Sequence, residues 1–182
     1  CFVLCTSFMG ENGELFVPMG GYEIRPNIGE VLIFGICIVL EEYAVIDTPG
    51  VYGISSFNDE EKVARDVILT ADLIINVVDA VHLERDLFLS LQVIETGIPT
   101  IIVLNMMDDA KKEGLALLEE KLGVPVIPAV AIKGKGLKEL KEKLHEARVG
   151  NIPLERQGQL KALTCRNYCR QSEALLILEG DE

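Results

Sequence analysis

Histidine and positive charge are scarce in this sequence, and each scarcity excludes a class of function. The only two histidines are His82 and His145, so no metal or catalytic set based on histidine can be assembled. Lysine and arginine number 17 against 29 aspartates and glutamates, which leaves a net charge of −12. An acidic surface repels nucleic-acid backbones, and we expect no nucleic-acid partner. A nucleotide is compatible with this charge because phosphate binding is local.

The sequence also has no long apolar run. A membrane-spanning helix needs about 18 apolar residues, and the longest candidate, 31–40, ends at Glu41. Residues 1–5 lack the basic segment and small-residue cleavage site of a signal peptide. The chain begins without Met, which indicates a fragment or an incomplete start. We expect a soluble fragment, and 182 residues that are 49% hydrophobic suit one α/β domain.

The five cysteines predict no disulfide framework, because their number is odd. A reduced cytosolic setting is the simplest interpretation. Cys1 with Cys5 and Cys165 with Cys169 make two pairs at opposite ends of the chain. Pairs with this spacing occur in four-sulfur zinc sites, but neither has the surroundings of a zinc knuckle. We interpret these cysteines as free thiols, with a zinc site as the alternative.

Short apolar runs alternate with amphipathic stretches from residue 43 onward. The runs predict strands at 43–46, 73–78, 98–104 and 124–127. The amphipathic stretches predict helices at 58–69, 82–95, 110–122 and 137–147. This alternation specifies a mostly parallel sheet flanked by helices, and such sheets bind ligands at the carboxyl ends of their strands.

The tetrapeptide Asn105-Met-Met-Asp108 follows one of these predicted strands and suits recognition of guanine. The carboxylate of Asp108 can accept two hydrogen bonds from the ring N–H and the amino group of guanine, a pair that adenine does not offer. Asn105 can bridge the purine and a neighbouring phosphate loop. Met106 is a packing residue that can also lie along the base.

A second tetrapeptide, Asp47-Thr48-Pro49-Gly50, follows the predicted strand at 43–46 and suits phosphate sensing. Asp47 can hold Mg²⁺ through a water molecule. The N–H of Gly50 is open to a γ-phosphate, because glycine has no side chain to cover it. Each tetrapeptide alone is a weak signal, but their order and their positions behind strands indicate a nucleotide site.

Further segments accompany the two tetrapeptides, namely Asp59-Glu-Glu-Lys-Val-Ala-Arg-Asp66, Asn76-Val-Val-Asp-Ala80, Leu83-Glu-Arg85 and Gly97-Ile-Pro99. Together these residues resemble the cytosolic G domain of the FeoB family of ferrous iron transport proteins. The resemblance runs from about residue 43 to about residue 145. It implies a three-layer, Ras-like P-loop GTPase fold with a mostly parallel sheet, whose N-terminal part is truncated or rearranged here.

The resemblance also implies a domain organisation and a biological setting. Residues 24–148 would form the G domain, after a poorly matched segment 1–23, and residues 149–182 would lead toward a helical adaptor. In the family a transmembrane permease that moves Fe²⁺ follows the adaptor, which places the G domain at the cytoplasmic face of the cell membrane. GTP and GDP are the implied ligands, with Mg²⁺ as the implied metal.

The expected reaction is attack on GTP by an ordered water, so no catalytic side chain is assigned. The counterpart of the family's phosphate loop, Gly-Asn-Pro-Asn-x-Gly-Lys-Ser/Thr, is the segment Ile24–Val31. Asn27 and Gly29 are kept and are predicted to bind nucleotide. Glu30 replaces the Lys that neutralises phosphate charge, and Val31 replaces the hydroxyl that binds Mg²⁺. These two replacements make Mg²⁺ binding and catalysis doubtful.

The effector segment is shortened as well. Only 15 residues separate Val31 from Asp47, whereas a helix, a switch segment and a strand need roughly 35. Without the resemblance, Val31–Leu40 reads as a buried strand; with it, its first half becomes the helix after the phosphate loop. The base loop is better kept, because Pro128–Gly134 resembles the family's Pro-Thr-Ser-Ala-Arg-Lys-Gly. Ala131 is then the residue whose N–H contacts the guanine oxygen.

Two classes of function follow from these features. The first is a GTPase domain that regulates Fe²⁺ uptake through GTP binding and hydrolysis. The second is a catalytically inactive pseudo-GTPase, or a truncated fragment with weak or no nucleotide binding. An altered reading frame over residues 1–42 is a third interpretation, since the resemblance begins abruptly.

Overall fold

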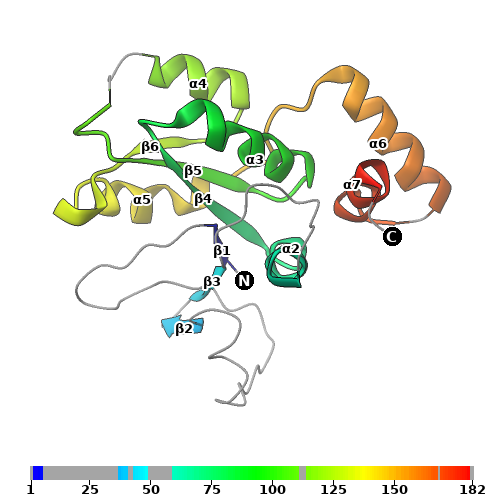
Figure 1. Cartoon of the computed structure of the whole chain (residues 1–182), viewed down its shortest axis with the longest axis horizontal. Helices are drawn as coiled ribbons and strands as arrows, with labels where there is room; N and C mark the ends of the chain where they lie inside the picture. Colours follow the sequence, from blue (N-terminus) through cyan, green and yellow to red (C-terminus); the bar gives the residue numbers. More distant parts are fainter. Residues whose placement is uncertain are drawn as a thin grey trace.

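The computed structural model describes residues 2–5, 37–40, 43–48, 59–110, 114–167 and 169–180 (Figure 1). Six strands form one sheet in the order β2-β3-β1-β4-β5-β6. Their bounds are Phe2–Cys5 (β1), Cys37–Leu40 (β2), Tyr43–Thr48 (β3), Leu73–Asp79 (β4), Thr100–Asn105 (β5) and Val126–Pro128 (β6). The pairing of β2 with β3 is antiparallel, and every other pairing is parallel. The sheet is therefore mostly parallel, as the sequence predicts.

The helices follow the strands in the predicted alternation. They are α2 (Asp59–Leu69), α3 (Leu83–Glu95), α4 (Leu115–Leu122), α5 (Leu137–Lys143), α6 (Leu154–Asn167) and α7 (Gln171–Glu179), with short 3₁₀ turns η1 (Ala131–Lys133) and η2 (Leu144–Glu146). Within the described residues, no helix combines the length and apolar character that crossing a membrane requires.

The observed bounds differ from the predicted ones mainly at strand starts. The strand β5 begins at Thr100 and β6 at Val126, each just after a proline. Proline has no N–H to donate, but the carbonyls of Pro99 and Pro125 still accept hydrogen bonds from neighbouring strands. The helix predicted at 110–122 is described from Leu115 as α4, and the one predicted at 137–147 ends at Lys143 and continues as η2.

The central position of β1 is a feature that the sequence did not predict. Residues Phe2–Cys5 lie between β3 and β4 and pair in parallel with both. The sheet thus includes part of the segment 1–23, which was predicted to lie outside the expected G domain at 24–148. Residues Cys37–Leu40 form β2, and the preceding residues 31–36, where a helix was expected, lie outside the described residues.

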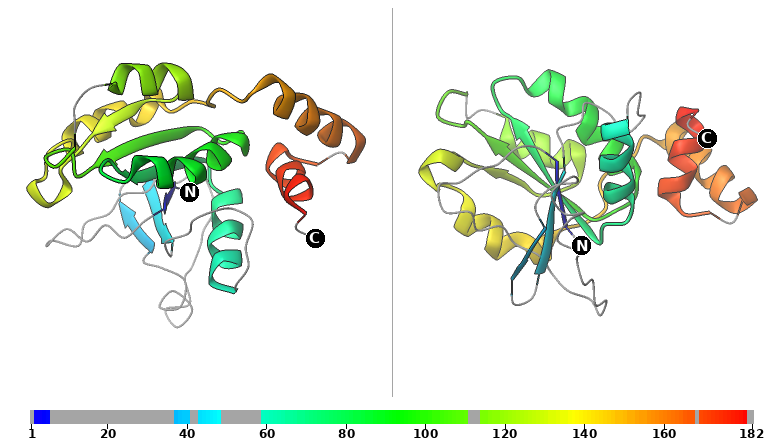
Figure 2. Two further views of the ribbon diagram at one scale, coloured as in Figure 1. Left: turned by 45° about the horizontal axis from the view of Figure 1, so that its top comes forward. Right: turned by 60° about the horizontal axis from the view of Figure 1, so that its bottom comes forward.

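Alternate residues of β4 and β5 pack against opposite layers of helices. Ile75 and Val103 belong to a buried cluster that takes in Leu144 after α5. Val78 and Ile102 belong to another, which reaches α3 and α4. Figures 1 and 2 show α3 and α4 on one side of the sheet and α5 on the other. This alternation explains why both strands are mostly apolar.

A polar contact lies inside the apolar layer between β4 and α3. The Asn76 amide donates a hydrogen bond to Ser90 Oγ over 2.7 Å, and both side chains are buried. Ser90 Oγ in turn donates to the carbonyl of Asp86 over 3.2 Å. Because unpaired buried polar groups are costly, this pair constrains the position of α3 on the sheet.

The helices α6 and α7 pack on each other beside the sheet (Figure 2). Leu160 of α6 and Leu175 of α7 share a buried cluster with Leu89 and Val93 of α3. At the rim of this cluster, Arg156 of α6 forms an ion pair of 2.9 Å with Glu95, the last residue of α3, and a second with Glu179 of α7. These contacts raise the pKa of Arg156, chiefly through the hydrogen bond to Glu95.

Gln171 makes a further contact between α7 and the end of α3. Its side-chain amide donates a hydrogen bond to the carbonyl of Glu95 over 2.9 Å. A Cβ on Gly97 would lie 3.0 Å from the Gln171 side chain, so the turn after α3 and the start of α7 are closely fitted. The cluster and these polar contacts together attach the helix pair to the sheet domain.

We predict that Arg156→Met loosens this attachment. Glu95 and Glu179 would lose their shared cation in a site that is only partly exposed, at a cost of about 1–3 kcal/mol. Hydrogen exchange of the α7 amides should accelerate while that of β5 stays unchanged. Arg166→Met, the same change at an exposed position of α6, serves as the control. Equal α7 protection in the two variants would show that the apolar cluster and the Gln171 hydrogen bond hold the helices without Arg156.

Candidate functional site

The carboxyl ends of β4, β5 and β6 meet at one edge of the sheet. Asp79, the last residue of β4, is the partner of Asn105, the last residue of β5. Leu104 of β5 is in turn the partner of Pro128, which ends β6. The residues after β5 and those after β6 are therefore neighbours in space, although the chain between them forms α4. This edge is where parallel sheets bind ligands.

Several hydrogen bonds attach the loop after β6 to the end of β5. Asn105 Oδ1 accepts the N–H of Ala131 over 3.0 Å, and the N–H of Met107 donates to the carbonyl of Ala129 over 3.2 Å. Two residues predicted to contact guanine, Asn105 and Ala131, are thus brought together directly. The N–H expected to contact the guanine oxygen is donated to Asn105 here, so a base would have to share or displace that bond.

The two methionines of the tetrapeptide take different environments. Met107 is buried in the cluster between the sheet and α4. Met106 is 43% exposed and has a positive φ of 61°, a conformation that is uncommon for residues other than glycine. This local turn directs the chain from the end of β5 toward Asp108. Met107 is a packing residue, whereas the Met106 side chain, which was expected to pack, is open to solvent.

Asp108 is held by a partner that the sequence did not suggest. Lys133 Nζ lies 2.6 Å from Asp108 Oδ2, across the two loops. The hydrogen bond from Lys133 lowers the pKa of the Asp108 carboxyl, and the same contact raises the pKa of Lys133. Only the motif resemblance at Lys133 could have signalled this contact. The carboxylate predicted to recognise guanine is therefore ionised and already paired.

The base loop closes tightly on β6. Val130 and Lys135 form a small antiparallel bridge around the turn η1. Gly136 follows with a φ of +86°, and a Cβ there would lie 2.5 Å from the carbonyl oxygen of Pro128. Gly134 also has a positive φ, +64°, but a Cβ on it would meet open space. Gly136 is thus required by both conformation and close packing, and Gly134 by conformation alone.

The phosphate side of the predicted site is described only in part. Asn27, Gly29, Pro49 and Gly50 lie outside the described residues, and their predicted roles stay predictions. Asp47 and Thr48 end the strand β3, and Thr48 is buried. The predicted contact of Asp47 with Mg²⁺ likewise stays a prediction, because only the backbone of Asp47 is described.

The end of β1 lies next to this second motif. Cys5, its last residue, is the partner of Thr48 in β3 and of Asn76 in β4. In P-loop folds the phosphate loop connects a strand of this kind to a helix. The segment Ile24–Val31, predicted as the phosphate loop, comes later in the chain and does not directly follow β1.

Asp79 and His82 form a local turn after β4. His82 Nδ1 lies 2.7 Å from Asp79 Oδ2, and Asp79 Oδ1 accepts the N–H of Val81 over 2.8 Å. These contacts lower the pKa of Asp79, with the hydrogen bond to His82 as the main cause. Asp86 Oδ2 accepts the N–H of Asp79 over 3.1 Å. The geometry gives Asp79 a structural role at the start of α3.

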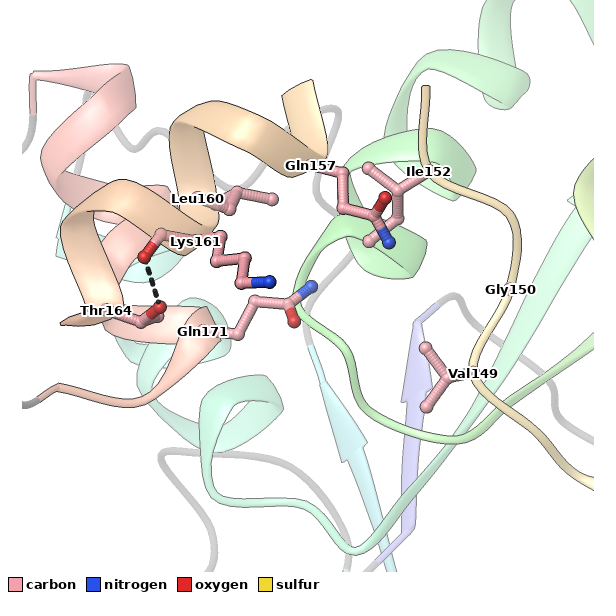
Figure 3. A pocket seen from close by; sticks show the side chains of 8 residues that line it. All are labelled: Val149, Gly150, Ile152, Gln157, Leu160, Lys161, Thr164 and Gln171. Atoms are coloured by element: carbon pink, nitrogen blue, oxygen red, sulfur yellow. Dashed lines mark hydrogen bonds between the residues drawn. The ribbon is translucent and has the colours of Figure 1, made fainter. Parts of the chain in front are cut away.

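Among the described residues, no group of metal-ligating side chains marks this edge, and a cavity lies elsewhere in the fold. No three His, Cys, Asp or Glu side chains gather as metal ligands in the part of the chain that is described. Cys165 and Cys169 are free thiols. A cavity of about 360 Å³ lies between residues 149–152, α6 and α7, next to Lys161 and Gln171 (Figure 3). None of its lining residues comes from the carboxyl end of a strand, and it lies where the helix pair is attached.

We predict that Gly136→Ala disturbs the base loop much more than Gly134→Ala does. Both changes place a side chain at positive φ, which costs about 1–2 kcal/mol. Only the Gly136 variant also overlaps the β6 backbone, which adds about 1–3 kcal/mol. Urea unfolding of the two variants measures the difference. Equal losses of unfolding free energy would contradict the tight closure of the loop on Pro128.

Comparison with known proteins connects this geometry to one family. A family model described as ferrous iron transport protein B matches residues 35–144. The Fe(2+) transporter FeoB of Escherichia coli K12 is 43% identical over 110 residues, and that of Salmonella typhimurium is 42% identical over 110 residues. The match covers 55% of this chain and 14% of each transporter, so the chain spans a small part of these relatives.

Solved structures give the same result for the fold. The cytosolic domain of L. pneumophila FeoB aligns with a TM-score of 0.64 and 32% identity, covering 80% of this chain and 73% of that one. A mutant of S. thermophilus NFeoB bound to GMPPNP aligns with a TM-score of 0.65 and 36% identity, covering 76% and 62% of the two chains. The predicted Ras-like P-loop GTPase fold is thereby confirmed. With its family match spanning β2 to η2, this chain belongs to the ferrous iron transport protein B family.

Proposed function

We propose that this chain binds guanine nucleotides as the G domain of a ferrous iron transporter. The observation that carries the proposal is the arrangement of Asn105, Asp108 and Ala131 at one strand edge, with the loop held by the Asn105–Ala131 hydrogen bond. The similar S. thermophilus domains were solved with GMPPNP and with GDP, which supports the same ligand class here.

The exposed carboxylate of Asp108 provides the basis for selecting guanine. An ionised carboxylate only accepts hydrogen bonds, and guanine presents two adjacent donors on one edge. Adenine presents no such pair, so it would leave the carboxylate desolvated and incompletely paired. The low pKa of Asp108 keeps this acceptor ionised throughout the neutral range. Selection of guanine over adenine should therefore show no titration of Asp108 between pH 6 and 8.

The wider role rests on the family relationship. We infer that the chain is part of a longer membrane transporter in which guanine nucleotide binding and hydrolysis regulate Fe²⁺ passage. The adaptor and permease are the inferred partners, and the cytoplasmic face of the membrane is the inferred location. The helices α6 and α7, attached to the end of α3, are positioned to connect the nucleotide domain to such an adaptor.

Hydrolysis is the part of the proposal that depends on the phosphate side. Asp47 at the end of β3 fits the expected position of a residue that holds Mg²⁺ through water. The bound metal would offset phosphate charge during attack by water. The inactive alternative is motivated by Glu30 and Val31, which replace a cation and a hydroxyl in the predicted phosphate loop.

We predict that Asp108→Asn changes the base preference from guanine to xanthine. The amide offers a donor where the carboxylate offers only acceptors, and xanthine has a carbonyl where guanine has its amino group. GDP affinity should fall by about tenfold or more, while the affinity for xanthosine diphosphate (XDP) should rise. Isothermal titration with GDP, XDP and ADP measures this change. Asp109→Asn, at the exposed neighbouring carboxylate, is the control. Unchanged GDP affinity in the Asp108 variant would refute the proposed site.

We predict that Glu30→Lys with Val31→Ser increases GTP affinity by about tenfold or more and makes it depend on Mg²⁺. The changes restore a cation for the phosphates and a hydroxyl for the metal. GTP titration with and without Mg²⁺, followed by phosphate release, measures both effects. Tight Mg²⁺-dependent GTP binding by the unchanged chain would instead exclude the inactive alternative and the assignment of Glu30 to the phosphate loop.

A further inference from the structure

The ion pair between Lys133 and Asp108 occupies the same carboxylate that the proposed function assigns to guanine. Nζ and Oδ2 are 2.6 Å apart, and the side chains are 54% and 34% exposed. The two residues are 25 positions apart and lie in different loops, so the contact is a product of the fold. The two adjacent donors of guanine would approach both oxygens of the carboxylate, and Oδ2 already accepts a hydrogen bond from Lys133.

The backbone of Lys133 is held in place, so its side chain extends from a fixed position close to Asp108. Its N–H donates to the carbonyl of Val130 over 2.9 Å, within the turn η1. The first residue of that turn is Ala131, whose N–H is bound by Asn105. The turn η1 thus contacts both side chains that are predicted to recognise guanine. The backbone N–H of Ala131 binds Asn105, and the side chain of Lys133 binds Asp108.

From this geometry we propose that Lys133 is an internal competitor of guanine, which occupies Asp108 in the nucleotide-free protein and must leave it when the base binds. The proposal rests on the proposed guanine site and adds a regulation to it. Release of Asp108 requires only a rotation of the Lys133 side chain, because the Lys133 backbone can stay in place. A flexible lysine stem permits that rotation.

The charges around the pair set how strongly Lys133 competes. Asp109 also attracts Lys133, and Lys135 adds a weaker attraction for Asp108. All of these groups are exposed, so salt screens their interactions and weakens the pair. The competition should therefore be strongest at low ionic strength. Its size is modest, because exposed ion pairs contribute little.

The test compares GDP binding by the unchanged chain, Lys133→Met and Lys135→Met. Lys135 is the matched control, since it is an exposed cation two positions away in the same loop. Removing Lys133 should tighten GDP binding by about two- to fivefold at low salt, and by less at high salt. Removing Lys135 should change GDP binding much less, because Lys135 contributes only a weaker attraction for Asp108. Equal or weaker GDP binding by Lys133→Met overturns the competition.

A nucleotide-free measurement separates this inference from the proposed function. Carbon NMR of the Asp108 carboxyl should show its pKa rising toward the ordinary value in Lys133→Met and far less in Lys135→Met. An unchanged Asp108 titration in Lys133→Met overturns the pair itself. If the titration shifts but no variant binds GDP, the guanine site is refuted and the competition with it. If all three chains bind GDP equally, the guanine site stands and the competition alone is refuted.

Discussion

The hydrogen bond from the Ala131 N–H to Asn105 Oδ1 is the contact on which the base end of the site depends. It joins the end of β5 to the loop after β6, and parallel pairing of those strands brings its two partners within reach. The hydrogen bond from Met107 to Ala129 and the Val130–Lys135 bridge hold the residues on either side of the turn η1. The position of Lys133 against Asp108 follows from the same attachment, so both recognition and competition depend on one short turn.

Much of the sheet could be predicted from sequence because burial determines its apolar runs, and the base end could be predicted from its motif residues. β4 and β5 are covered on two faces, which requires the mostly apolar runs that the sequence displays. Asn105 follows such a run directly, so its place at the strand edge was predictable. The Lys133–Asp108 contact was not, since exposed charges in separate loops leave no periodic pattern. The steric role of Gly136 also depends on a tertiary contact, with Pro128.

The N-terminal part shows where sequence patterns fail for a different reason. Phe2–Cys5 is a short apolar segment far along the chain from its partners β3 and β4, and periodicity cannot report pairing over such a distance. Cys37–Leu40 carries strand-forming residues and pairs with the adjacent β3, so the local interpretation of this segment as a strand agrees with the structure there. The family model also begins here, at residue 35.

The positions of β1 and β2 set a condition on any phosphate loop in this chain. If the loop lies at Ile24–Val31, only residues 32–36 separate it from the start of β2 at Cys37. Five residues of helix extend about 7.5 Å, too little for a covering helix and a return to the sheet edge. If the loop instead follows β1, residues 6–36 are available for loop and helix. The Glu30 and Val31 variants therefore test where the phosphate loop lies in the chain as well as whether it needs a cation and a hydroxyl. An effect on GTP binding requires that residues 30 and 31 reach the phosphates.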